Sequence, residues 1–186
     1  MSKKKIARII SEISNGFLTM MLTPLLAIVI SPLKIELKVV YCLAYLLTTV
    51  LPYLILKKLG KASDYEFTKR EERPPYFISI SLLFGVLFLL LRRYGIEPLT
   101  DVSLAIFLVA SIITLITFFW KISGHMTYST LLFFTLTYLL SPYFLFLFLF
   151  SPFIAWSRIK LEKHNLAQVI AGTLVTAIIC VLTYWA

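Results

Sequence analysis

Six long stretches of this 186-residue chain contain no charged residue, and they constrain its fold more than any other feature. They cover residues 13–33, 39–56, 74–91, 102–120, 122–157 and 164–186. Each is long enough to cross a hydrocarbon layer of about 30 Å. Because backbone groups in lipid must find partners within their own segment, we expect helices, even where Phe and Leu alternate as in a strand.

The fifth stretch is too long for a single span. Its 36 residues would form a helix of about 54 Å, nearly twice the hydrocarbon thickness. Ser141 followed by Pro142 is typical of a helix start, so we expect one helix near 124–140 and another near 142–157. The sequence therefore predicts an all-α transmembrane bundle with six to seven membrane segments, forming one integral membrane domain over residues 1–186.

The basic residues are concentrated on one side of this predicted bundle. Counting spans from the amino terminus places residues 1–12, residues 57–73 and the turns at Lys121 and Arg158 on the same face. This face holds 14 of the 18 Lys and Arg residues. The positive-inside rule predicts that it is cytoplasmic, together with the amino terminus. No small-residue cleavage site follows the basic start, which predicts that the first span is retained.

The net charge of +9 raises the question of the partner. In a membrane protein, basic loops set the topology and meet anionic lipid headgroups, so we expect the bilayer as a partner and no nucleic acid. Asp64 and Glu66 have no second acidic cluster on this face with which to share a metal ion, so we expect no metal. We expect Glu71 and Glu72 to pair with neighbouring basic residues.

Both histidines lie in short polar clusters that the span count places on the basic face. The clusters are Lys69-Arg70-Glu71-Glu72-Arg73-Pro74, Ser123-Gly124-His125, and Ser157-Arg158 followed by His164. Guanidinium groups bind tetrahedral oxyanions, a Ser-Gly helix start offers free N–H groups, and imidazole can be a nucleophile or general acid. Taken singly, each residue is better explained as a topology signal or a helix start. Their co-location favours a phosphate site.

In these clusters the chain resembles the type 2 phosphatidic acid phosphatase superfamily, whose pattern is Lys-x6-Arg-Pro, Pro-Ser-Gly-His and Ser-Arg-x5-His-x3-Asp. The resemblance covers residues 64–172. The third motif is the most specific, and Ser157-Arg158 with His164 matches it. Ser123-Gly124-His125 matches the second motif after its first position, and Arg73-Pro74 matches the end of the first.

This resemblance implies a helical-bundle enzyme that works without a metal or other cofactor. It implies that His164 attacks phosphorus to form a phosphohistidine and that His125 protonates the leaving oxygen. It also implies that Arg73, Arg158 and the Ser123–Gly124 backbone hold the phosphoryl oxygens and neutralise their charge in the transition state.

Three positions depart from the family pattern. Glu66 stands where the first motif has Lys, and Lys69 or Arg70 would have to substitute as phosphate ligands. Ile122 replaces the proline of the second motif, which alters only the entry to a helix. Gln168 replaces the Asp that orients the nucleophile. Its carbonyl can still orient the ring, but it lacks a charge, and a comparable Asp-to-Asn change in serine proteases costs about 10⁴ in rate.

The expected function is hydrolysis of a lipid phosphomonoester or diphosphate, either an isoprenoid phosphate or diphosphate or a phosphatidate-like lipid. Gln168 and Glu66 leave a second hypothesis open, namely a catalytically silent relative that binds a phosphorylated lipid. A small transporter with a phosphate-binding centre is a third hypothesis. A transporter of this kind should carry polar residues near the middle of several membrane spans. The spans of this chain carry almost none, so the third hypothesis is disfavoured.

Overall fold

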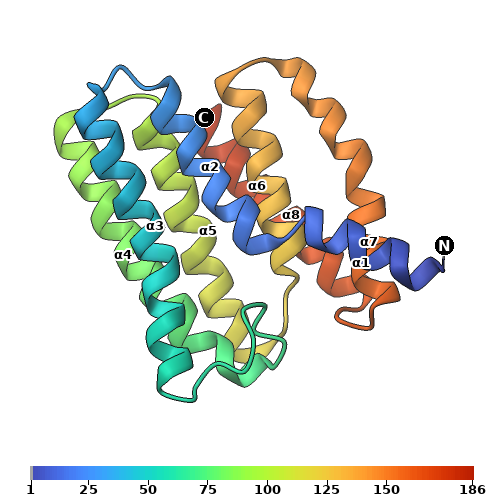
Figure 1. Cartoon of the computed structure of the whole chain (residues 1–186). Helices are drawn as coiled ribbons and strands as arrows, with labels where there is room; N and C mark the ends of the chain where they lie inside the picture. The colour runs from blue at the N-terminus through green and yellow to red at the C-terminus, as the bar shows by residue number, and fades with distance from the viewer. Residues whose placement is uncertain (1) are drawn as a thin grey trace.

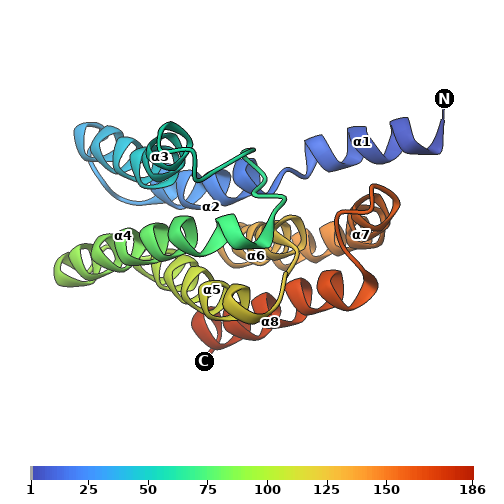
Figure 2. The same ribbon diagram turned by 90° about the horizontal axis from the view of Figure 1, so that it is seen from below.

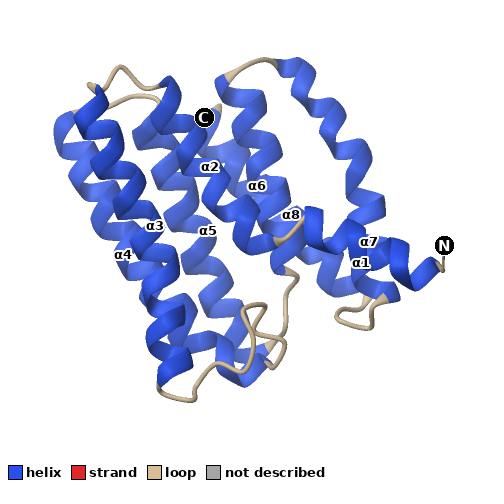
Figure 3. Cartoon of the chain, viewed as in Figure 1, coloured by secondary structure: helices blue, strands red, loops and turns tan. Residues whose placement is uncertain are grey.

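The computed structural model describes residues 2–186, and within this range it contains helices and no strand, which confirms the predicted fold class (Figure 3). Figure 1 shows the helices as one bundle, with α1 projecting from its side. The elements are α1 (Lys3–Ile13), α2 (Gly16–Ile30), α3 (Ile35–Lys58), η1 (Arg70–Glu72), α4 (Arg73–Tyr94), α5 (Leu99–Phe119), α6 (Gly124–Leu139), η2 (Pro142–Phe150), α7 (Ser151–Lys160) and α8 (Leu166–Tyr184), where η denotes a 3₁₀-helix.

The described chain has six segments that are long and apolar enough to cross a membrane, so it is an integral membrane protein. They are Lys3–Ile30, Ile35–Lys58, Arg70–Tyr94, Leu99–Phe119, Pro142–Lys160 and Leu166–Tyr184. The predicted seventh span corresponds to α6, which has only 16 residues. A membrane-crossing helix usually needs about 20 residues, so α6 is not among these six segments, but it runs between the same two ends of the bundle as the longer helices (Figure 1). It packs against α2, α5, α7, α8 and η2.

The connections between helices gather at two ends of the bundle, as the span count predicts. Figure 1 shows the 59–69 loop, the 120–123 segment and the 161–165 turn at one end. The 31–34 and 95–98 connections lie at the other end (Figure 1). All three polar clusters of the sequence therefore lie at the same end.

The first helical region differs from the predicted single span. A break at Ser14 and Asn15 separates α1 from α2. The Asn15 side chain accepts hydrogen bonds from the amides of Phe17 (2.9 Å) and Leu18 (3.3 Å), so it caps a new helix that begins at Gly16. Only α2 packs within the bundle, whereas α1 projects sideways from it (Figure 2) and contacts α7.

The region after Ser141 also differs from the prediction of one α-helix over 142–157. Pro142–Phe150 is a 3₁₀-helix, and the α-helix begins only at Ser151. Pro152 has no N–H, so it cannot donate the α-helical bond to the Phe148 carbonyl. No side chain of Pro142–Phe150 is buried. Packing on the bundle therefore does not impose α-helical spacing on this segment.

Two glycines allow α2 and α8 to approach the start of α6. A Cβ atom on Gly16 would lie 3.0 Å from the Gly124 carbonyl group. A Cβ atom on Gly172 would lie 2.9 Å from the Ser123 carbonyl oxygen. Both neighbours are backbone atoms, which cannot rotate away as a flexible side chain can. The start of α6 is thus held between α2 and α8 by contacts that only glycine permits.

We expect Gly172→Ala to destabilise the protein by roughly 1–3 kcal/mol, because the added methyl group overpacks the contact with Ser123. Thermal unfolding in detergent measures this as a lower melting temperature. Gly124→Ala is the matched control, since a Cβ atom there would meet nothing within 4 Å. Equal melting temperatures for the two variants would show that α8 can shift away from α6 without cost.

Candidate functional site

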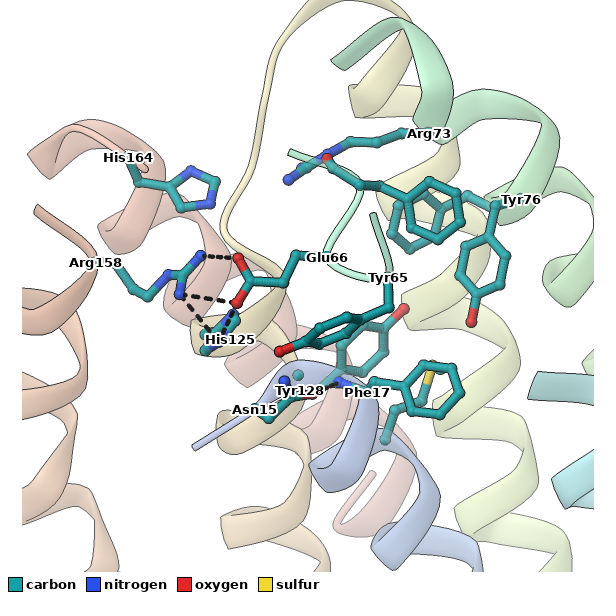
Figure 4. A pocket seen from close by; sticks show the side chains of 15 residues that line it. Asn15, Phe17, Tyr65, Glu66, Arg73, Tyr76, His125, Tyr128, Arg158 and His164 are labelled. Carbon is teal, nitrogen blue, oxygen red and sulfur yellow. Dashed lines mark hydrogen bonds and ion pairs between the residues drawn. The ribbon is translucent and has the colours of Figure 1, made fainter. Parts of the chain in front are cut away.

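A cavity of about 60 Å³ lies between the start of α2, the 59–69 loop and the starts of α4 and α6. One water molecule needs only about 10–15 Å³, so the cavity has room for a group of several heavy atoms. Arg73, His125, Arg158 and His164 line it, together with Glu66 (Figure 4). The fold therefore brings residues from all three sequence clusters to one place.

His164 lies in the turn between α7 and α8, with its ring directed into the cavity (Figure 4). Its Nδ1 atom is 3.0 Å from Oε1 of Gln168, one helical turn further along. Because a carbonyl oxygen only accepts hydrogen bonds, Nδ1 carries the proton and Nε2 keeps its lone pair. This is the orienting contact that the sequence analysis expects of Gln168.

Gln168 is itself held in place by the start of α8. Asn165 caps this helix, and the Asn165 side chain accepts a 2.9 Å hydrogen bond from the Gln168 amide. In return, Gln168 Oε1 accepts a 3.3 Å bond from the Asn165 amide, which completes a capping box. One amide oxygen therefore serves both the helix cap and the His164 ring.

The surroundings of His164 keep its ring neutral. Burial, with the positive charge of Arg73 as the next cause, lowers the pKa of His164 to about 3. Lys121 and Arg158 act in the same direction, and the Gln168 contact opposes them in part. A neutral imidazole with a free Nε2 is the form in which histidine acts as a nucleophile.

Arg158 and His125 form a second group in the cavity. Nη1 of Arg158 lies 3.2 Å from Nε2 of His125 and also contacts the Ser11 hydroxyl group. The Ser11 hydroxyl is 3.4 Å from the same His125 nitrogen. Nε of Arg158 is buried and has no hydrogen-bond partner within residues 2–186. Arg158 thus retains a donor for a group that is not part of the chain.

Ser11 was not expected from the sequence. It belongs to α1, which packs against α7, and its side chain is buried. No motif surrounds it, because its role arises only from the docking of α1 at the end of the bundle. Tyr128 was also not expected from the sequence. It lines the cavity from α6, and its buried hydroxyl group has no partner among residues 2–186.

Arg73 lines the cavity and also stabilises the fold around it. Its Nε donates to the Phe67 carbonyl (2.8 Å) and its Nη1 donates to the Ile122 carbonyl (2.8 Å). These bonds tie the 59–69 loop and the segment before α6 to the start of α4. Figure 4 shows the guanidinium group pointing toward the space in front of His164.

Glu66 occupies the middle of the cavity (Figure 4). Its carboxylate is 3.1 Å from Nη2 of Arg158 and 3.8 Å from both His125 Nε2 and the Lys163 amine. The next residue, Phe67, has a φ of +49° and a buried ring stacked on Tyr76. Such a backbone conformation persists only where its surroundings fix it. An anion of the chain itself is therefore held against Arg158.

Lys69 and Arg70 do not reach the cavity, although the sequence predicts them as phosphate ligands. Lys69 pairs with Glu72 at 3.6 Å, as expected, and its side chain is exposed. Arg70 pairs with Glu71 at 3.6 Å, also as expected, and donates to the Phe118 carbonyl at 3.1 Å. Neither residue is among those that line the cavity.

Two other lysines lie nearer the site. Lys121 donates to the Lys163 carbonyl at 3.0 Å, and burial and then Arg73 lower the pKa of Lys121. Lys163 donates to the Thr68 hydroxyl at 3.0 Å. These contacts join the turn before α8 to the 59–69 loop and add positive charge around Glu66.

The start of α6 presents backbone donors to the cavity. Ser123 is its cap, with Oγ 3.5 Å from the Met126 amide, and the Ser123 amide donates to the Gln168 carbonyl at 3.3 Å. Gly124 and His125 line the cavity, and their amides donate to no acceptor within residues 2–186. The Gly124 amide is therefore available to an anion, whereas that of Ser123 is not.

In the part of the chain that the structure describes, no group of three or more His, Cys, Asp or Glu side chains is arranged to hold a metal ion.

The chain matches no model of a known protein family, no curated protein and no solved structure.

We expect His164 to stay neutral when a detergent-solubilised sample is titrated from about pH 8 to about pH 5, because the ordinary pKa of histidine is about 6.5. The chain has two histidines, so His125→Asn leaves a single ring whose nitrogen and Cε1 chemical shifts report protonation and tautomer. Since the unfolded chain takes up this proton and the folded chain does not, His164 destabilises the fold as the pH falls below about 6.5.

Gln168→Ala is the control for the tautomer. Without the carbonyl acceptor, the Nε2-protonated tautomer should appear beside the Nδ1-protonated one. A titration midpoint near the ordinary value of about 6.5 would contradict the buried environment of His164.

Proposed function

We propose that this chain is an integral membrane lipid phosphatase that hydrolyses a lipid phosphomonoester or diphosphate. One observation carries the proposal, namely a neutral His164 ring that Gln168 holds with Nε2 directed into a cavity lined by Arg73 and Arg158. This is a nucleophile placed beside two guanidinium groups that suit a phosphoryl group. The motifs shared with the type 2 phosphatidic acid phosphatases support the same assignment.

In the first step, Nε2 of His164 attacks phosphorus, and the bond from phosphorus to the leaving oxygen breaks. The leaving oxygen takes a proton from His125, whose protonated form the bound phosphoryl group favours. Arg73, Arg158 and the Gly124 amide hold the phosphoryl oxygens during this transfer. In the second step, water loses a proton to His125 and attacks the phosphohistidine, which releases inorganic phosphate and restores both rings.

The place of the cavity favours amphiphilic substrates. It lies at the end of the membrane bundle, and Phe17, Met20 and Phe77 form an apolar part of its wall. A polar head can enter from the interface while its isoprenoid or acyl tail stays in the bilayer. We infer that this end, with His164 and the amino terminus, faces the cytoplasm, because it holds 14 of the 18 basic residues.

A second candidate function rests on Glu66 and Gln168. A carboxylate against Arg158 opposes a bound phosphoryl group, and an amide at position 168 cannot stabilise a charged His164 ring as a carboxylate does. These two features favour a protein that binds a phosphorylated lipid without turnover. Binding of a lipid phosphate is common to both candidates, so only turnover separates them.

We expect the detergent-purified protein to release inorganic phosphate from at least one of phosphatidate, isoprenyl monophosphate and isoprenyl diphosphate, with EDTA present. His164→Ala should lower this release by at least about 10³-fold, because it removes the nucleophile. Lipid binding should remain, because the arginines are unchanged. Binding without release by the wild-type protein would favour the silent binder. Full activity of the variant would exclude His164 as the nucleophile.

We expect Glu66→Gln to bind orthovanadate or inorganic phosphate more tightly, by on the order of tenfold or more, because the incoming anion no longer displaces a carboxylate from Arg158. Isothermal titration calorimetry measures the change. Glu71→Gln is the matched control, since its exposed side chain pairs only with Arg70 in the structure. Weaker binding by Glu66→Gln would show that the carboxylate assists the bound anion.

A further inference from the structure

Helix α1 has two distinct faces and a set of exposed, mainly basic residues. Ala7, Ser11 and Ser14 are buried and form the face that docks on the bundle. Their small side chains allow close packing against α7, and Ser11 reaches Arg158 and His125. The other residues of the helix are mostly exposed, so their composition shows what surrounds it.

The second face is apolar and outward. Ile6, Ile9, Ile10 and Ile13 follow the three- and four-residue spacing of one helical stripe. Ile9 is 43% exposed and Ile13 is 73% exposed. Ile10 packs against the buried cluster of Met126, Ile154 and Val169, so the exposed part of the stripe is Ile9 and Ile13.

The remaining exposed residues of α1 are mainly basic. Four basic residues lie on α1 against one acidic residue, Glu12, and all five are exposed: Lys3, Lys4, Lys5, Arg8 and Glu12. Basic residues in the middle of a bilayer cost about 2.5–3.5 kcal/mol each. A helix with this composition lies at the membrane surface, with its lysines among the headgroups.

The two sides of α1 border spaces of opposite character. Arg8 and Glu12 line a polar cavity of about 400 Å³ that also includes Lys163. On the other side, Ile10 and Ile13 line an apolar groove of about 580 Å³ between α2, α6 and α7. The boundary between polar and apolar surroundings therefore follows the length of α1.

The orientation of α1 agrees with this boundary. Figure 2 shows α1 from the side, whereas α7 is seen nearly along its axis. Figure 1 shows α1 lying across the direction of the bundle helices. A helix that crosses the spanning direction lies in the plane of the membrane.

We propose that α1 is an interfacial helix that binds the anionic headgroup surface of the bilayer and inserts Ile9 and Ile13 among the acyl chains. The excess of basic residues selects anionic lipid as the occupant. This proposal does not depend on phosphatase activity. Because Ser11 lies on the same helix, α1 also places Arg158 and His125 at the depth of the headgroups.

The test uses the full chain in vesicles of phosphatidylcholine, with or without phosphatidylglycerol. With Cys42 and Cys180 changed to Ala, an environment-sensitive fluorophore is attached at Ile9→Cys, Ile13→Cys or, as the matched control, Arg8→Cys. Brominated acyl chains should quench the probe at positions 9 and 13, with blue-shifted emission, and leave position 8 unquenched. Phosphatidylglycerol should increase this quenching.

Replacing Lys3, Lys4 and Lys5 with Gln should weaken the response to phosphatidylglycerol on the order of a hundredfold, since each lysine near an anionic surface contributes roughly fivefold. Unchanged melting temperatures confirm that each variant is folded. Equal, water-like emission at positions 8, 9 and 13 would overturn the proposal. Quenching at positions 9 and 13 that appears only when the protein is diluted in lipid would overturn it too, because a second copy of the chain would then cover the isoleucines at higher protein density.

Discussion

The candidate site depends on the close packing of α2 and α8 around the first turn of α6. Gly16 lies against the backbone of Gly124, and Gly172 lies against that of Ser123. This contact places a short helix in the middle of the bundle with its amino-terminal end open to a cavity. His125 lies in this first turn, and the position of α8 sets that of Gln168 and therefore of His164. The spacing of the two imidazole rings is thus a result of backbone packing.

The membrane segments could be predicted from the sequence because charged residues are excluded from lipid whatever the tertiary contacts are. The co-location of the two histidines and two arginines of the cavity was also predicted, since an even number of membrane crossings between the clusters returns the chain to the same end. Ser11 could not be predicted, because nothing in α1 indicates that it docks on Arg158. Lys69 was misplaced for a local reason, namely the turn of η1, which points its side chain outward.

The positive charge of the site is offset by carboxylate groups to a greater extent than the sequence suggests. The Glu66 carboxylate pairs with Arg158 and Lys163, and Asp64 is a second carboxylate near Arg73 and Lys121. Arg73 is also committed to two backbone carbonyls, so part of its donor capacity serves the fold. Glu66 stands at the position where the phosphatase pattern has a lysine, and it neutralises Arg158. An anion that entered such a site would have to exchange with the Glu66 carboxylate and would not fill an empty, positively charged space.

Exchange of anions has a consequence for the end of a reaction cycle. When a free anion leaves the cavity, Glu66 can return to Arg158 because the stacked Phe67 holds its backbone in place. Arg158 then needs no counter-ion from solution in the resting state. The Glu66 carboxylate competes with a departing anion for Arg158. In the phosphatase that we propose, a carboxylate in this place would favour release of the product anion over its retention.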